Sequence, residues 1–197
     1  MKETRGRPRK FDPEEALANA LMVFWTKGYA GTSLDELAQA MNMKRPSIYN
    51  AFGNKEALYR AALKAFQLQL NGGLEELSKA KAIKPALNRF FQTAIDVYMT
   101  GETPLDCFIF CTAPAETIAH PDVRSDLYAI TTEIDRALKR VFSRGQETGQ
   151  FSAQSDPMIA AQLGQATLHS LAVRARAGQS RASLSKMAKG IVETIFR

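Results

Sequence analysis

The sequence predicts an all-α protein of about nine helices, in which a small N-terminal three-helix domain precedes a larger helical domain. Apolar residues recur at the i, i+3, i+4, i+7 spacing of amphipathic helices along most of the chain. Capping residues and prolines mark the starts of these segments, and no stretch has the pattern expected of a strand. The 197 residues are 45% hydrophobic and 23% charged, which is typical of a globular protein and excludes the disordered and fibrous classes.

The first helix is predicted to lie between Asp12 and Gly28. Asp12 offers an N-cap side chain, Pro13 suits the first helical position and Glu15 suits the third. Gly28 ends the helix. One side of this helix is apolar and is predicted to face a core; it consists of Leu17, Leu21, Phe24 and Trp25.

The second helix is predicted in the stretch TSLDELAQAMN. Thr32 or Ser33 serves as its N-cap, because an acidic residue follows each of them at the third position. Asn42 can adopt the left-handed conformation that ends a helix. The apolar face of this helix consists of Leu34, Leu37, Ala38 and Met41.

The third helix is short and contains a proline near its start. Pro46 is tolerated only in a first turn, so the helix begins near Lys44 or Arg45. Gly53 and Asn54 end it and cap the longer helix that follows. A helix of barely two turns buries little, so we expect it to be presented to a partner.

The second and third helices together have the pattern of a helix-turn-helix, whose second helix enters the major groove of DNA. About three residues separate them, and an ordinary helical hairpin with a solvated face is the alternative. The small core between them is predicted to consist of Leu37, Ala38, Met43, Ile48 and Phe52.

The side chains left outside this core suit nucleic acid. Arginine and asparagine can form paired hydrogen bonds with base edges, whereas hydroxyl and ammonium groups donate to phosphate oxygens. The outer face of the third helix presents Arg45, Ser47, Tyr49 and Asn50. Donors for phosphate are Thr32, Lys44, Tyr49 and Lys55.

The first ten residues are strongly basic. They contain five Lys or Arg residues and one acidic residue, out of a formal net charge of +6 for the chain. This segment is either a solubilising terminus or a basic arm that lies along DNA. Its stretch RGRPRK is similar to the core of an AT-hook, which would insert Arg5, Arg7 and Arg9 into a narrow minor groove.

The segment from Ala20 to Leu63, ALMVFWTKGYAGTSLDELAQAMNMKRPSIYNAFGNKEALYRAAL, resembles the TetR/AcrR family of transcriptional regulators. The resemblance implies that Tyr49 and Lys55 contact phosphates. It also implies that Arg45, Ser47 and Asn50 lie where they can meet bases. Asn42 stands where the family pattern commonly has glycine, and Pro46 lies within the first turn of the recognition helix.

Three parts of the chain are expected: a basic arm (1–10), a DNA-binding domain (11–70) and an effector-binding and dimerisation domain (71–197). The sequence NGG at 71–73 is expected to interrupt the helical pattern. Beyond it, Thr103 as N-cap and Pro104 at the first position mark one helix start. The helices of this third part are predicted over 84–99, 104–118, 121–148, 156–177 and 181–196.

The helix near 156–177 is apolar or small over more than one face. That is wider than one core contact demands, so a second partner is expected. The family resemblance implies that this helix and the one near 181–196 pack against their copies as a four-helix bundle. A homodimer of this kind would place two recognition helices on one side of double-stranded operator DNA.

The family resemblance further implies a small-molecule effector bound among the middle helices. Aromatic stripes at helical spacing are usually core, so each candidate is either a pocket residue or a core residue. The candidates are Phe90, Phe91, Tyr98, Cys107, Phe108, Cys111, Glu116 and His169.

Cys107 and Cys111 are expected to share one face of the helix predicted over 104–118. They are core residues, sensors of an oxidant or electrophile, or ligands of a soft metal ion. If Cys107 is a sensor, its place near the start of this helix should lower the pKa of its thiol and make it the faster to react.

Other functional classes have little support in the sequence. No catalytic motif, metal-type cluster or cofactor-binding loop is found, so an unrecognised enzyme is a poor alternative and no cofactor or metal is expected. No apolar run is long enough for a membrane span, and the first residues do not form a signal peptide. A cytoplasmic location is therefore expected.

Overall fold

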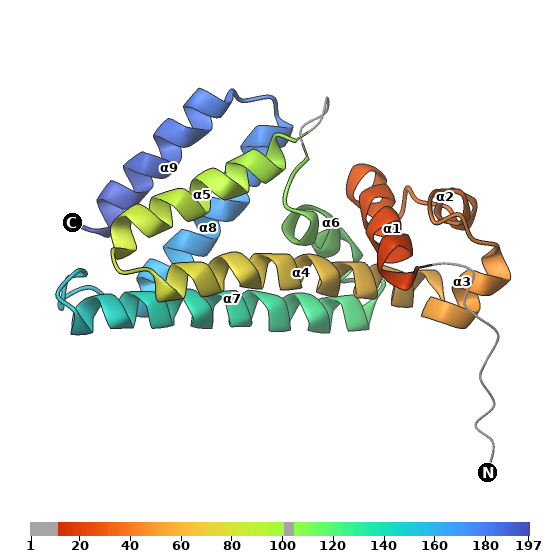
Figure 1. The fold of residues 1–197 in the computed structure, drawn as a ribbon, viewed down its shortest axis with the longest axis horizontal. Coiled ribbons are helices and arrows are strands. Elements are labelled where there is room, and N and C mark those ends of the chain that lie inside the picture. Colours follow the sequence, from red (N-terminus) through yellow and green to blue (C-terminus); the bar gives the residue numbers. More distant parts are fainter. Residues whose placement is uncertain (1–11, 101–104) are drawn as a thin grey trace, which may run out of the picture. The chain divides into compact units, whose positions relative to one another are not determined.

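The computed structural model describes residues 12–100 and 105–197, and these ranges contain nine α-helices and no strand (Figure 1). The prediction of an all-α fold is confirmed. Arg5, Arg7 and Arg9 lie outside the described residues. The helices are α1 (Pro13–Lys27), α2 (Leu34–Ala40), α3 (Arg45–Phe52), α4 (Lys55–Lys79), α5 (Ile83–Tyr98), α6 (Phe108–Glu116), α7 (Pro121–Glu147), α8 (Pro157–Arg176) and α9 (Arg181–Ile195).

The chain forms two compact units, Met1–Leu63 and Lys64–Arg197, and α4 contributes to both. The functional boundaries that the sequence suggests after residues 10 and 70 stay predictions. Most of the later helices begin and end within one residue of the expected positions; these are α5, α7, α8 and α9.

The first unit is built around an aromatic cluster under α1. The ring of Phe24 meets the ring of Tyr59 edge-on at 5.1 Å between centroids, and Tyr29 lies 5.1 Å from Tyr59. Phe24 and Tyr59 are fully buried, so their combined apolar area makes a large contribution to the stability of this small unit. In the predicted core between α2 and α3, Leu37, Met43 and Ile48 are buried, while Ala38 and Phe52 are half-buried.

Local capping signals position the helices of this unit as expected. The Asp12 carboxylate accepts a backbone hydrogen bond from the first turn of α1 (2.9 Å). Ser33 caps α2, and Glu36 completes a capping box with it. Asn42 has φ 49° and Gly53 has φ 83°, which confirms the two left-handed positions that flank α3. These caps fix the entry and exit of the short third helix.

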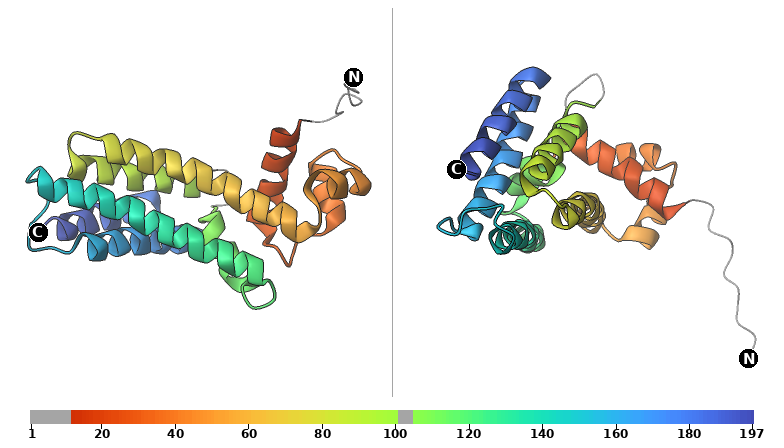
Figure 2. Two further views of the ribbon diagram at one scale, coloured as in Figure 1. Left: turned by 90° about the horizontal axis from the view of Figure 1, so that it is seen from below. Right: turned by 60° about the vertical axis from the view of Figure 1, so that its left-hand side comes forward.

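The second unit is organised around α8. This helix packs against α7 on one side and against α5 and α9 on others (Figures 1 and 2). Small residues permit close approach: a Cβ on Gly164 would lie 3.4 Å from the side chain of Leu138 on α7. The second part of α4 runs beside α7 in both figures, and the Gln67 amide donates to the Glu133 carboxylate.

Two expectations about helix boundaries were wrong, and the first concerns the start of α6. The helix begins at Phe108, four residues later than predicted, and its N-cap residue is Cys107. The predicted cap residues Thr103 and Pro104 lie outside the described residues. Asp106 is buried, and its carboxylate accepts a hydrogen bond from the Arg176 guanidinium of α8 (2.9 Å). Leu105, Asp106 and Cys107 are all buried in a non-helical segment, because this anchor and the core hold three successive side chains inward.

The second wrong expectation concerns the NGG stretch. Helix α4 continues through residues 71–73 without a break. Gly73 faces α5, and a Cβ there would lie 3.2 Å from the ring of Phe90, whereas Gly72 has open space around it. Tertiary packing of Phe90 against the bare backbone therefore explains Gly73, and neighbouring helices offset the low helix propensity of two glycines.

Alanine substitutions at these two glycines should have different effects. Gly72→Ala should raise the free energy of unfolding by about 0.5–1 kcal/mol, because alanine loses less backbone entropy in a helix and meets nothing. Gly73→Ala should raise the free energy of unfolding by less than Gly72→Ala does, or lower it, because the Phe90 ring must shift to make room for the new Cβ. Urea unfolding of both variants measures the difference, and equal stabilisation would contradict the packing role of Gly73.

Candidate functional site

Helix α3 exposes a polar face in the first unit. Ile48 points inward and is fully buried, whereas Tyr49 is 50% exposed and Asn50 is exposed. Ser47 is half-buried. Lys44, the N-cap residue, is exposed and makes no capping hydrogen bond with its side chain. Ile48 is thus the one fully buried side chain of this helix, which leaves hydroxyl, amide and ammonium groups outside.

Arg45 is held at the start of α3 by Asp35 of α2. The Arg45 Nε donates to Asp35 Oδ1 (2.6 Å), and Nη2 of Arg45 also pairs with Oδ2 of Asp35. The hydrogen bond that Arg45 donates to Asp35 raises the pKa of Arg45 above its already high ordinary value, so the guanidinium stays charged. Because both side chains are exposed, such a pair is weak and can be exchanged for a base or phosphate.

Lys55 lies at the N-terminus of α4, where Asn54 caps the helix by accepting the backbone N–H of Ala57 (2.8 Å). The Lys55 ammonium sits 4.3 Å from the centroid of the Tyr29 ring. This cation–π contact orients the side chain. A lysine at a helix N-terminus forms a local positive site that favours an anion.

Thr32 lies differently from the other predicted phosphate donors. It is only 3% exposed, and its hydroxyl donates to the carbonyl of Gly28 (2.7 Å). The donor is therefore used to hold the turn between α1 and α2. Thr32 supports the geometry of the motif and does not offer its hydroxyl to solvent.

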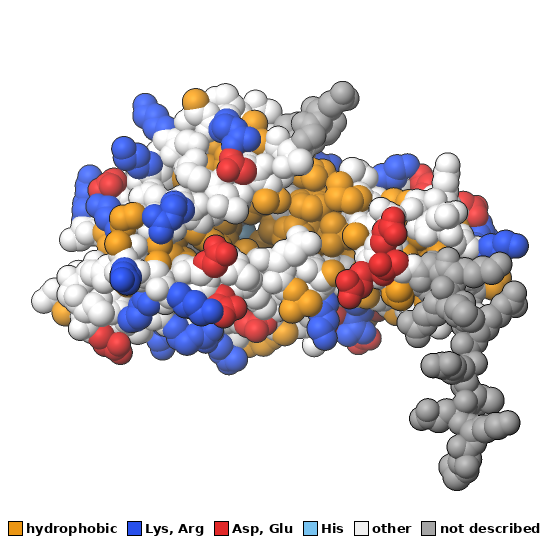
Figure 3. Space-filling model, viewed as in Figure 1, with side chains coloured by type: hydrophobic (Ala, Val, Ile, Leu, Met, Phe, Trp, Pro, Cys, Tyr) orange, Lys and Arg blue, Asp and Glu red, His pale blue; other side chains and the backbone are white. Residues whose placement is uncertain are grey.

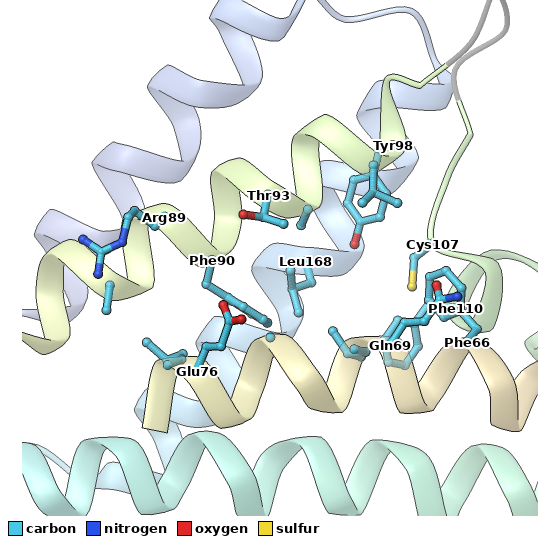
Figure 4. Close-up of a pocket in the computed structure, with 16 residues that line it drawn as sticks. Phe66, Gln69, Glu76, Arg89, Phe90, Thr93, Tyr98, Cys107, Phe110 and Leu168 are labelled. Atoms are coloured by element: carbon cyan, nitrogen blue, oxygen red, sulfur yellow. The ribbon is translucent and has the colours of Figure 1, made fainter. Parts of the chain in front are cut away.

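A pocket of about 300 Å³ opens in the second unit among α4, α5, α6 and α8. Hydrophobic side chains gather in the hollow between α5 and α4 (Figure 3). Tyr98 and Cys107 lie at one end of the pocket, and Glu76 and Arg89 lie at the other (Figure 4). The wall consists of Phe66, Gln69, Leu70, Gly73, Glu76, Leu77, Ala86, Arg89, Phe90, Thr93, Ala94, Val97, Tyr98, Cys107, Phe110 and Leu168.

The structure brings three of the candidate pocket residues into this wall, namely Phe90, Tyr98 and Cys107. The others lie outside it: Phe91 and Phe108 are fully buried core residues, and Cys111, Glu116 and His169 are half-buried. The Glu116 carboxylate lies 3.9 Å from the Nε2 atom of His120 at the end of α6.

The contribution of α4 to the pocket was missed. Six wall residues lie on α4, between Phe66 and Leu77, a segment that was expected to be broken at residues 71–73. The i, i+4, i+7, i+11 spacing of Phe66, Leu70, Gly73 and Leu77 is the signal that could have identified this face.

Burial dominates the chemistry of the two thiols. Burial raises the pKa of Cys107 to about 12, although the backbone amides of Phe110 and Ile109 act in the opposite direction. Burial and the Asp106 carboxylate raise the pKa of Cys111 to about 11. The expectation of a lowered pKa at Cys107 was therefore wrong, because the loss of water around a residue that is only 2% exposed outweighs the field of the helix N-terminus.

Tyr98 and Cys107 lie close enough for each to affect the pKa of the other. Burial raises the pKa of the Tyr98 hydroxyl well above its ordinary value. With both groups protonated near neutral pH, this end of the pocket carries no charge. It suits the apolar part of a ligand.

The described residues contain no group of three or more His, Cys, Asp or Glu side chains that could hold a metal ion. Within the same ranges, no helix has the length and hydropathy needed to cross a membrane.

Comparison with known proteins agrees with this architecture. The family model for bacterial regulatory proteins of the tetR family matches residues 16–62, and the tetracyclin repressor-like C-terminal domain model matches residues 84–191. The HTH-type transcriptional repressor ComR of Escherichia coli (strain K12) is 27% identical over 190 residues, covering 95% of this chain and 90% of ComR.

Two solved structures are similar over nearly the whole chain. A cysteine mutant of the TetR family transcriptional regulator CifR, complexed with 26-bp double-strand operator DNA, is 30% identical with a TM-score of 0.87, covering 95% of this chain and 98% of CifR. The reduced form of Escherichia coli NemR is 21% identical with a TM-score of 0.82, covering 93% of this chain and 96% of NemR; it supports the fold.

The two family models lie where the structure has its two units, and the C-terminal model alone spans more than half of the chain. The family consists of regulators and not of enzymes, so the enzymatic alternative is set aside. The resemblance of residues 20–63 to these regulators is confirmed. The chain belongs to the tetR family of bacterial regulatory proteins and is a DNA-binding transcriptional regulator with a helix-turn-helix motif.

Proposed function

We propose that this regulator is a homodimeric repressor that binds a palindromic operator through α3 and is released when a small molecule occupies the pocket of the second unit. The observation that carries the proposal is the outward polar face of α3 within a chain 30% identical to a regulator solved on operator DNA. ComR, which is similar over 190 residues, is named a repressor. Such a protein acts where operator DNA is, in the cytosol.

The exposed side chains of the first unit divide into two roles. Lys44, Tyr49 and Lys55 contact phosphates, because they present ammonium or hydroxyl donors at helix starts or on an exposed face. Asn50 and Arg45 read base edges, since an amide and a guanidinium can each form two hydrogen bonds with one base.

Ser47 and the basic N-terminal arm complete this proposed interface. Ser47, half-buried at the start of α3, adds a hydroxyl that can reach a base. The basic residues Arg5, Arg7 and Arg9 supply the arm that enters the minor groove.

Dimerisation is proposed through α8 and α9. Three large apolar side chains of α8 are exposed at spacings that place them on one face: Ile159, Leu163 and Val173. Exposed apolar residues at this spacing indicate a partner helix. In a twofold-symmetric dimer, each of these residues would be buried in both subunits. The second copy of α8 is the natural occupant, because the family packs these helices into a bundle.

The pocket is the proposed effector site. Its volume falls at the lower end of ordinary small-molecule sites, and its wall is mostly apolar with a few polar groups. The opposite charges at Glu76 and Arg89 lie at one end, so a polar group of the ligand is accommodated there.

A second candidate is covalent sensing at Cys107, and the one observation in its favour is that this sulfur lines the pocket. The raised pKa of both thiols weakens it, because the thiolate is the reacting form. A soft metal ion is weaker still, since the described part of the chain offers no third ligand near the two sulfurs.

The division of roles in the first unit can be tested by two substitutions. Lys55→Ala should weaken binding to all DNA sequences similarly and reduce the slope of log K against log salt by about one unit. Asn50→Ala should relax discrimination at particular base pairs by about 1–3 kcal/mol. Binding to DNA selected from a random pool, and to its single-base variants, provides both measurements.

Lys139→Ala, which removes an exposed lysine on α7, is the matched control and should leave DNA binding unchanged. If Lys55→Ala and Asn50→Ala lower affinity for every sequence by the same factor, the proposed roles are wrong.

The α8 interface is tested by charge insertion. Leu163→Lys should raise the dimer dissociation constant about 100-fold or more, because burying a leucine contributes about 1.5–3 kcal/mol and a twofold interface contains it twice. Sedimentation over a range of concentrations measures this constant. Leu68→Lys is the control, since Leu68 is a 64%-exposed leucine on α4. Identical behaviour of the two variants would argue against α8 as the interface.

The thiol candidate is tested by alkylation of the folded protein. At pH 8 a thiol with a pKa of about 11 is roughly one thousandth thiolate, so Cys111 should label slowly and Cys107, with a higher pKa and less exposure, more slowly still. Both rates should rise about tenfold per pH unit up to pH 10. Iodoacetamide labelling followed by peptide mass spectrometry gives the rates. If Cys107 in the folded protein is labelled at pH 7 as fast as in the urea-unfolded chain, the result would support covalent sensing at Cys107.

A further inference from the structure

One buried polar atom beside the pocket has no hydrogen-bonding partner in the described part of the chain. It is Nε2 of His169, on α8. Leaving a buried nitrogen unpaired is costly, and such groups are rare in native structures unless a ligand, water or function explains them. Burial lowers the pKa of this histidine, so the ring is neutral at pH 7.

Phe110 of α6 lies against this histidine and lines the pocket. The two rings contact each other, with centroids 3.6 Å apart and planes inclined at 44°. Phe110 and Leu168, the residue before His169, both line the pocket. Figure 4 shows Phe110 at the end where Cys107 lies. The Phe110 side chain therefore contacts the imidazole of His169 and also lines the pocket.

The turn that carries Phe110 is weakened by its own sequence. Pro114 lies inside α6 and has no N–H to donate to the carbonyl of Phe110, four residues earlier. Phe110 is also only half-buried, unlike Phe108, which is fully buried two positions before it. Phe110 is therefore less restrained than its aromatic neighbour in α6.

Two buried polar groups of α6 and α8 already have partners. The Thr112 hydroxyl donates to the Phe108 carbonyl (2.5 Å), and the Gln165 amide donates to the Thr131 carbonyl (3.0 Å). His169 differs from them, because its buried Nε2 retains the capacity to hydrogen-bond to a ligand.

We propose that Phe110 and His169 form an inner subsite of the pocket, in which a neutral aromatic alcohol displaces the Phe110 ring and its hydroxyl hydrogen-bonds to Nε2 of His169. An aromatic ring replaces the contacts of the ring that it displaces. A hydroxyl both donates and accepts, so it suits either tautomer of the imidazole. The uncharged surroundings of this end favour a neutral ligand over an ion. This inference rests on the proposed function, whose effector class it specifies.

The test compares two probes of nearly equal shape, 1-naphthol and naphthalene, on the full-length protein. Binding is measured by calorimetry for the wild type and for His169→Phe. The variant should shift the ratio of the two dissociation constants about tenfold in favour of naphthalene, which corresponds to one net hydrogen bond. It should also melt at a higher temperature, because an unpaired buried nitrogen is removed.

His169→Gln, which keeps a hydrogen-bonding group, should retain most of the preference for 1-naphthol. His169→Leu is a second apolar variant, to be used if His169→Phe does not fold. A lower melting temperature with an unchanged ratio would mean that His169 is only structural. An unchanged ratio, or binding of neither probe by the wild type, overturns the subsite.

Operator binding of the same samples separates this inference from the function on which it rests. The wild type and His169→Phe should both bind DNA selected from a random pool. If both proteins bind DNA but the ratio of the two dissociation constants is the same for both, the proposed subsite is wrong and the proposed function is unaffected. If the wild type selects no DNA, the proposed function itself fails.

Discussion

The close packing of α8 is the constraint on which the second unit depends. Its small residues, such as Gly164 against Leu138, allow α7 to approach closely, and this fixes the directions in which its remaining side chains point. Leu168 then reaches the pocket, Arg176 reaches Asp106 before α6, and Leu163 is left exposed. One helix therefore supports the pocket wall, the anchor of the segment before α6 and the proposed dimer face.

Local signals in the sequence predicted the first unit well, because its geometry depends on neighbours in the chain. Asp12, Asn42 and Gly53 act through their own backbone or through the adjacent turn, and each lies as expected. Thr32 and Ser33 were equivalent candidates for one cap, and only the structure distinguishes them. Thr32 turns inward to Gly28, a contact that depends on the path of the turn.

The second unit was harder to predict, because its decisive contacts join distant residues. The start of α6 is set by Asp106 and Arg176, seventy positions apart, and this ion pair overrides the helix start that Pro104 suggested. The same holds for Gly73, whose place in α4 depends on Phe90. Three of the candidate pocket residues line the wall, and the α4 residues were missed because composition alone suggested a break there.

The chemistry of Cys107 shows which of two electrostatic effects wins at a buried helix start. Amides at a helix N-terminus favour a thiolate, but they act over one turn, whereas removal of water affects the whole charge. The pKa of about 12 means that desolvation is the larger effect here. The same low polarity makes the unpaired Nε2 of His169 costly. A neutral ligand that offers a hydrogen bond gains from both conditions: it loses little on leaving water, and it satisfies an atom that the folded chain leaves unpaired.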